Sequence, residues 1–174
     1  MSRPPELSHT FDHMRFIVKG VNMTRKVFEK KSVIKGATVQ QLWDFHAQPN
    51  AFAKLTPPPI FIRMRENKLT SLTEGTVNFT MWIGPIPLHW VAEHKPGPTP
   101  TSFTDRQVIG PMAFWEHQHI FRAVPEGVEL TDHVTIEHQP EAIGTFTRLM
   151  FDGLPLQIFF LYRHLRTRLA LGKK

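Results

Sequence analysis

Between residues 60 and 138 the chain alternates apolar and polar residues in short segments, and this pattern constrains the fold most. Successive side chains of a strand point to opposite faces, so a period of two residues predicts strands. Proline and glycine clusters separate the segments, as at residues 84–87, 95–101 and 110–111. Such short connections predict antiparallel neighbours, because parallel strands need long crossovers. Together with an expected first strand at residues 25–35, the pattern predicts a sheet of seven strands.

Two short helices are expected between the first and second strands. Thr38 and Gln41 fit a capping box, in which each side chain bonds the backbone N–H of the other residue. Pro49 ends the helix that follows. Asn50 begins a second short helix, which ends at the prolines 57–59 because they force an extended backbone.

A long helix is expected at the C-terminal end. Residues 141–152 have a partly helical pattern, which Gly153 and Pro155 interrupt before a helix that runs to about Leu171. The apolar stripe of this last helix should pack on the concave face of the sheet. The expected stripe consists of Ile158, Leu161, Tyr162, Leu165 and Leu169. The predicted fold class is therefore α+β, with a curved antiparallel sheet wrapped around a long C-terminal helix.

Length and composition favour one globular domain. With 174 residues the chain is long enough to bury about 70% of its unfolded surface. Residues 24–174 are expected to form the domain, and residues 1–23 a partly ordered extension. We find no apolar run of 18 residues and no signal-peptide pattern, so we expect neither a membrane span nor secretion. The absence of cysteine excludes disulfides, thiolate catalysis and cysteine zinc sites, and agrees with a cytoplasmic location.

The formal charge of +6 raises the question of an anionic partner. Arg163, Arg166 and Arg168 give the last helix a basic end. A solvated surface explains the same residues, because cations in the last turns of a helix complement its dipole. No aromatic-rich RNA-binding motif or glycine-rich phosphate loop accompanies them, so we expect no nucleic-acid partner. A partner-binding module that acts through this basic surface stays an alternative.

Polar residues fall on the apolar face of a predicted hairpin at residues 103–121. In its second strand His117 and His119 are in phase with the aromatic residues, and so are Asp105 and Gln107 in its first strand. A buried polar group without a partner costs about 1–3 kcal/mol. These four side chains should therefore bond one another or face a cavity.

The turns predict how these side chains pair across the sheet. The hairpin loop places Asp105 opposite His119, and Gln107 opposite His117. The following turn places His119 opposite Asp132. The expected result is a row Asp105–His119–Asp132 that crosses three strands on the inner face.

The order of elements resembles the helix-grip fold of the SRPBCC (START-like) superfamily. Several blocks are similar to its bacterial branch of cyclase/dehydrase-like or ligand-binding proteins: LWDFHAQPNAFAKLTPPP, IGPIPLHWVAEH, FTDRQVIGPMAFWEHQHIF, LTDHVTIE and the ending YRHLRTRLA. The resemblance covers roughly residues 27–171. It implies a cavity between the sheet and the long helix, in a superfamily that binds lipids, polyketides, hormones and other apolar molecules. The superfamily also contains cyclases and aromatase-like proteins, so the fold alone does not decide the function.

The expected function is binding of a small, largely apolar molecule of lipid, polyketide or aromatic type in this cavity. The alternative is a filled core in which the histidines and acids satisfy one another. The resemblance supplies no catalytic or binding residues, so the candidates rest on phase and register. Walls are expected from Phe79, Met81, Trp90, Trp115, Phe121, Phe159 and Leu161, and polar contacts from His94, Asp105, Gln107, His117, His119 and Asp132.

Two chemical alternatives use the same polar residues. His119 or His117, with Asp105, could act as an acid/base in a cyclase or dehydratase reaction. Both histidines with Asp105 or Asp132 could also form a two-histidine-one-carboxylate metal site. Hydrogen bonds between neighbours explain these residues as well, so we expect neither a metal nor a cofactor.

Overall fold

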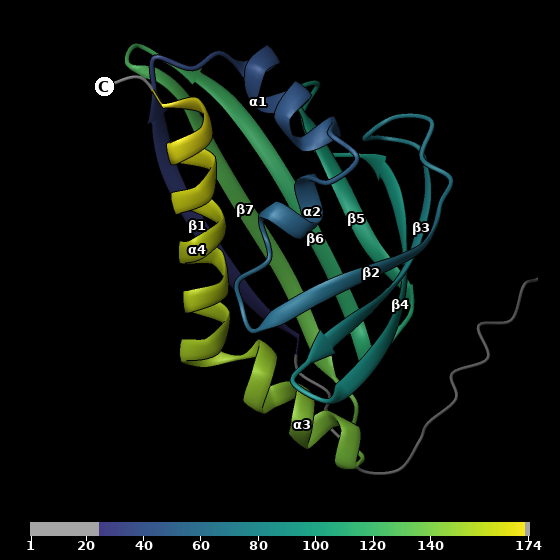
Figure 1. Cartoon of the computed structure of the whole chain (residues 1–174). Coiled ribbons are helices and arrows are strands. Elements are labelled where there is room, and N and C mark those ends of the chain that lie inside the picture. Colours follow the sequence, from purple (N-terminus) through teal and green to yellow (C-terminus); the bar gives the residue numbers. More distant parts are fainter. Residues whose placement is uncertain (1–24, 173–174) are drawn as a thin grey trace, which may run out of the picture.

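The computed structural model describes residues 25–172, and within them the chain forms a seven-stranded antiparallel sheet and four helices (Figure 1). The strands are Lys26–Lys35 (β1), Ile60–Asn67 (β2), Gly75–Ile83 (β3), Ile86–Pro96 (β4), Ser102–Ile109 (β5), Met112–Val124 (β6) and Gly127–His138 (β7). The helices are Val39–Ala47 (α1), Ala51–Lys54 (α2), Ala142–Phe151 (α3) and Gly153–Leu171 (α4). The predicted α+β helix-grip architecture is confirmed. The expected extension at residues 1–23 lies outside the described residues.

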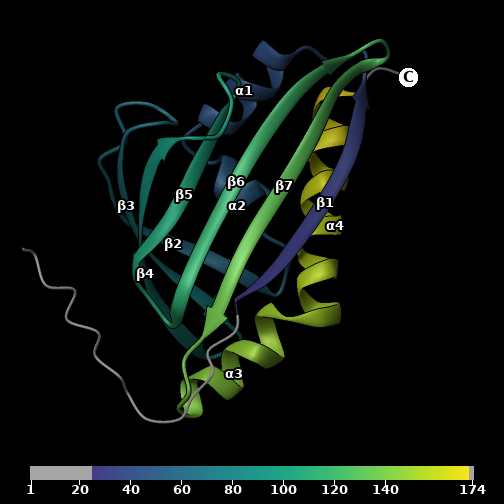
Figure 2. The same cartoon turned by 180° about the vertical axis from the view of Figure 1, so that it is seen from behind.

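The sheet is curved, and the described helices lie on one side of it. The strand order is β1-β7-β6-β5-β4-β3-β2, so the first strand joins the last one and every neighbouring pair is antiparallel. Figure 1 shows α4 along β1, with α1 and α2 over the other part of the concave face and α3 across one end. Figure 2 shows the opposite, convex face of the sheet. The helices α1, α2 and α4 therefore cover the concave face of the sheet.

Local sequence signals explain the helix starts. The Thr38 hydroxyl accepts a hydrogen bond from the Gln41 backbone N–H at 3.2 Å, and the Gln41 side chain accepts one from the Thr38 N–H at 2.9 Å. The predicted capping box is thus confirmed. At α4, the Asp152 carboxylate caps the helix by accepting from the Gly153 N–H at 2.9 Å. No helix within residues 25–172 is long and apolar enough to cross a membrane.

Two apolar clusters form the core on the concave side. The larger cluster lies between the middle of the sheet and α4 and is built around Phe79, Trp90 and Trp115. The smaller cluster lies beneath α1 and is built around Ile34 and Phe121. The polar residues of β6 lie between these two clusters along the strand.

The predicted register is right for one side of β6 and wrong for the other. His119 lies opposite Asp132 on β7, as predicted. On β5, however, Asp105 lies opposite His117 and not His119, so Gln107 has no place opposite His117. The reason is the hairpin end, where the Gln107 side chain bonds both the backbone N–H and the C=O of Met112. The register moves by two residues, which preserves the inward face of every side chain.

The predicted apolar stripe of α4 is also wrong. Leu161 and Leu165 face outward, with 50% and 43% of their surfaces exposed. The buried face contains Leu156, Phe160, Arg163, His164 and Thr167. Leu156 and Phe160 on this face pack into the larger apolar cluster, whereas Arg163 lines the pocket and His164 bonds Asp132. The more polar face of the helix is therefore the buried one.

Candidate functional site

A pocket of about 430 Å³ lies between the sheet and α4, in the size range of small-molecule sites. Its walls are mainly aromatic and aliphatic, with polar side chains that come from both strands and helices. Of the residues predicted from the sequence, it is lined by Phe79, Met81, Trp90, His94, Asp105, Trp115, His117, His119 and Phe159. The expected cavity under the last helix is therefore present, and the core is not filled.

Four predicted residues lie outside the pocket lining. Gln107 closes the β5–β6 hairpin through Met112. Phe121 is buried in the smaller apolar cluster, and the outward position of Leu161 takes it away from the pocket. Asp132 is 1% exposed and lies behind the histidines, where it supports them without reaching the pocket.

Several lining residues were not predicted from the sequence. His46 comes from α1, Phe52 from α2, and Phe160 and Arg163 from α4. A usable signal existed for α4, because Leu156, Phe160, Arg163 and Thr167 recur at the spacing of one helix face. That face mixes aromatic and charged residues, whereas the Leu-rich face looks like a normal core stripe.

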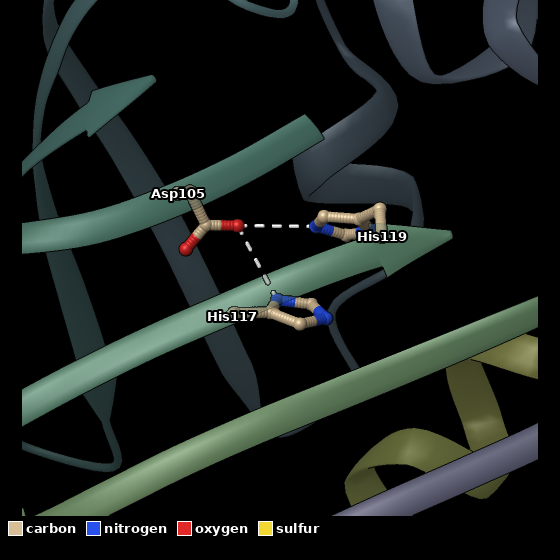
Figure 3. A group of neighbouring side chains, drawn as sticks. All are labelled: Asp105, His117 and His119. Carbon is tan, nitrogen blue, oxygen red and sulfur yellow. Dashed lines mark hydrogen bonds and ion pairs between the residues drawn. The ribbon is translucent and has the colours of Figure 1, made fainter. Parts of the chain in front are cut away.

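Asp105, His117 and His119 meet at the pocket wall. Figure 3 shows the Asp105 carboxylate on β5 facing both imidazoles of β6 with a single oxygen. That oxygen, Oδ2, accepts a hydrogen bond from His119 Nε2 at 3.0 Å and lies 3.3 Å from His117 Nδ1. Alternate residues of one strand point the same way, which explains why the two rings lie only 3.8 Å apart.

Asp132 connects these histidines to α4. Its Oδ1 accepts a hydrogen bond from His117 Nε2 at 2.9 Å, and its Oδ2 accepts one from His164 Nε2 at 3.0 Å. The other nitrogen of His164 lies 2.7 Å from the Ser32 hydroxyl on β1. His119 Nδ1 lies 3.1 Å from Asp132 Oδ1 without hydrogen-bond geometry. A chain of contacts thus runs from the pocket wall through Asp132 to both β1 and α4.

The charges of this network depend on mutual stabilisation. Burial alone would raise the pKa of Asp105 and Asp132, but the contacts with the histidines outweigh it and hold both pKa values well below their usual range. Burial alone would lower the pKa of His117, but Asp105 and Asp132 outweigh it and raise that pKa. The geometry therefore favours two carboxylates around a protonated His117.

Two other histidines face the pocket with the opposite tendency. Burial, together with the nearby charges of His119 and Arg163, lowers the pKa of His46 to about 3. Burial also lowers the pKa of His94. Each ring donates its Nδ1 proton to a backbone carbonyl, of Leu42 at 2.8 Å and of Leu72 at 3.1 Å. Their Nε2 atoms are therefore hydrogen-bond acceptors in the neutral ring.

The same three residues at the wall have a donor set that metals use. One ligand atom from each of Asp105, His117 and His119 lies within 4.8 Å of the others, and two imidazoles with one carboxylate suit divalent transition metals. Asp132 would then hold the imidazoles from behind, as second carboxylates do at metal centres. The hydrogen bonds described above account for the same positions without an ion.

The fold has clear counterparts among solved structures. A Chromobacterium violaceum protein aligns with a TM-score of 0.63 at 10% identity, covering 86% of this chain and 99% of that one. Major latex-like protein 151 of Panax ginseng aligns at 0.61 and 14% identity, with the same coverage of both chains. The chain has the helix-grip fold. The Zhui aromatase/cyclase from Streptomyces sp. R1128 also shares it, with a TM-score of 0.62 at 13% identity over 84% of this chain and 93% of that one.

These similarities confirm the fold that the sequence blocks indicated. No family model matches the sequence, and no match is found among curated proteins. At 10–14% identity the helix-grip relatives establish the architecture alone, so function has to be argued from the pocket of this chain.

Proposed function

We propose that this helix-grip protein binds a small, largely apolar molecule of lipid, polyketide or aromatic type in the pocket beneath α4. The observation that carries the proposal is the open volume of about 430 Å³ between walls that include Phe79, Trp90 and Trp115. Interiors normally pack to the density of organic crystals, so a cavity of this size lined by aromatic rings is an exception that suits a guest.

The hydrogen bonds of the wall favour binding over catalysis. Both nitrogens of His117 face carboxylate oxygens, and His119 Nε2 donates to Asp105. A general acid must have its proton within reach of the substrate. Here the imidazole protons are directed to Asp105 and Asp132, so they hold the wall together and orient a guest rather than react with it.

A cyclase or dehydratase is the second candidate, because His117 and His119 do reach the pocket lining. Among the solved structures with this fold is an aromatase/cyclase. In such a reaction a protonated His117, or His119, would transfer a proton to a carbonyl or enol of the guest once its contact with Asp105 opened. Substitution by Gln separates the two roles, since a binder keeps its function and an enzyme loses turnover.

The basic-surface alternative loses one of its three arginines. Arg163 is 6% exposed and lies at the pocket, which leaves Arg166 and Arg168 on the outside of α4. Two exposed cations near a helix end are accounted for by its dipole. No described feature favours a macromolecular partner over the pocket.

Binding can be tested with Nile red, a neutral apolar dye whose fluorescence rises in apolar surroundings. The variant Ala92→Phe fills the pocket, because Ala92 lines it and is 3% exposed. We expect at least tenfold weaker dye binding in this variant, and unchanged binding in Ala170→Phe on the exposed side of α4. Equal dye binding in wild type and Ala92→Phe would contradict the proposal.

A parallel measurement identifies the natural guest. Native mass spectrometry of protein purified from its own host should show a co-purifying small molecule that is absent from Ala92→Phe. Once that molecule is identified, we expect His117→Gln and His119→Gln to bind it as wild type does. Wild type should bind it without converting it to a product. If wild type converts the molecule and both variants have lost this activity, the proposed binding function is wrong and the cyclase or dehydratase function holds.

A further inference from the structure

We infer that the pocket takes an apolar acid, whose carboxylate pairs with the guanidinium of Arg163. This inference rests on the proposed ligand-binding function and names the chemical class of the guest. It starts from Arg163, a cation of the pocket lining that has no ion-pair partner within residues 25–172.

Arg163 is a buried cation with no counterion among the described residues. It lies on the inner face of α4, lines the pocket and is 6% exposed. Its Nε has no hydrogen-bond partner, and within residues 25–172 no carboxylate lies within ion-pair distance of its guanidinium. Its nearest aromatic contacts are weak, with Cζ 5.9 Å and 5.7 Å from the ring centres of Phe159 and Phe160.

The two carboxylates of the site do not serve as partners for this arginine. Asp132 directs one oxygen to His117 and the other to His164. Asp105 directs Oδ2 to His117 and His119. Both acids are thus engaged by imidazoles of β6 and α4. In the part of the chain that the structure describes, no short contact compensates the positive charge of Arg163.

A guest in the pocket would remove water from the guanidinium of Arg163. In an open pocket, water can accept hydrogen bonds from the guanidinium. An apolar guest displaces that water, and an unpaired buried cation is strongly unfavourable. The guest must therefore bring its own acceptor, and a carboxylate matches the planar fork of five N–H donors with two parallel hydrogen bonds.

Three other polar groups of the lining disfavour an anion beside them. His46 and His94 present acceptor Nε2 atoms, and Asp105 carries a negative charge. These groups suit hydroxyl or other donor groups of a guest and repel an anion. Arg163 is therefore the point of the pocket at which a carboxylate lies, with the apolar body against Phe79, Trp90 and Trp115.

The test compares decanoic acid with decan-1-ol, which have the same chain length and differ in charge. Each is titrated against bound Nile red at pH 7.5. We expect wild type to bind the acid roughly 10- to 100-fold more tightly than the alcohol. In Arg163→Met this preference should vanish while the alcohol binds as before, and Arg168→Met, on the exposed side of the same helix, should keep the wild-type preference.

A second measurement needs only wild-type protein, so it stands even where Arg163→Met fails to fold. Carbon-13 NMR of carboxyl-labelled decanoic acid gives the pKa of the bound acid. Pairing with Arg163 should lower it below its value in water, whereas burial without a counterion would raise it. A raised pKa, or equal affinities for acid and alcohol, would overturn the inference and leave ligand binding intact. Failure of both compounds and of Nile red to bind would remove the proposed function itself, and this inference with it.

Discussion

Strand β6 and helix α4 both direct polar side chains toward the interior, but the sequence pattern predicts this only for β6. In β6, His117 and His119 share a face with Trp115, so the polar residues stand out against an apolar pattern. In α4, Arg163 and His164 are buried while Leu161 is half exposed. The hydrophobic pattern thus identifies the inner face of the strand and selects the wrong face of the helix.

The difference comes from what each element packs against. A strand inside a sheet has two faces, and its neighbours fix which one is inner. The inner face of α4 is fixed by partners from distant parts of the chain, namely Asp132 on β7, Ser32 on β1 and the open pocket. Amphipathicity predicts a buried helix face only where the partner surface is apolar.

Asp132 is the residue that connects the two elements, so its loss should give the largest effect. Asp132→Ala leaves His117 and His164 buried without their shared acceptor. Removing one member of a buried charged contact costs about 3–5 kcal/mol, and we expect a loss near the middle of that range, about 4 kcal/mol. Urea unfolding measures it. Glu129→Ala is the matched control on the same strand, since its ion pair with Arg122 is exposed and should contribute at most about 1 kcal/mol. Equal losses of unfolding free energy in the two variants would show that the contacts of Asp132 stabilise the fold no more than an exposed ion pair does.

Adjacent residues of α4 give the next largest contrast. Phe160 is 1% exposed and contacts the pocket, whereas Leu161 is 50% exposed. Phe160→Ala should lower the free energy of unfolding by about 3 kcal/mol, the low end for Phe→Ala because the pocket beside it is already open. Leu161→Ala should cost less than about 0.5 kcal/mol, as surface substitutions do. Chemical denaturation of both variants shows which face of α4 is buried. A larger loss in Leu161→Ala would restore the face that the sequence pattern predicts.

Several parts of the fold and site follow from the sequence because their signals are local. Alternation identified the strands, and the Thr38–Gln41 capping box identified the start of α1. Strand phase alone identified the inward side chains Asp105, His117 and His119. The pairing of β5 with β6 did not follow, because a side chain of Gln107 closes the hairpin where a backbone turn was expected.

The polar lining residues His46 and Arg163, which helices contribute, are among those that the sequence did not predict. His46 on α1 and Arg163 on α4 reach the pocket only because the helices pack across the sheet. No spacing rule along the chain relates either residue to β6. Tertiary packing also gives these polar groups environments that differ from one another, and that difference predicts their response to pH.

His46 on α1 and His117 on β6 should respond to pH with opposite sign. The pKa of His46, lowered to about 3, means that its contribution to stability is present above pH 6.5 and is lost as the pH falls toward 3. The raised pKa of His117 means that its contribution is present below pH 6.5 and is lost as the pH rises through the folded-state pKa. We expect stability to fall by about 2 kcal/mol from His46 alone between pH 6.5 and 4.5, less than the full 1.4 kcal/mol per unit because the ring borders the open pocket. Urea unfolding of wild type and His46→Gln across this range measures the contribution as the difference in slope. Parallel pH profiles for the two proteins would contradict this prediction. They would show that the His46 ring is hydrated in the folded protein and that its pKa is not lowered.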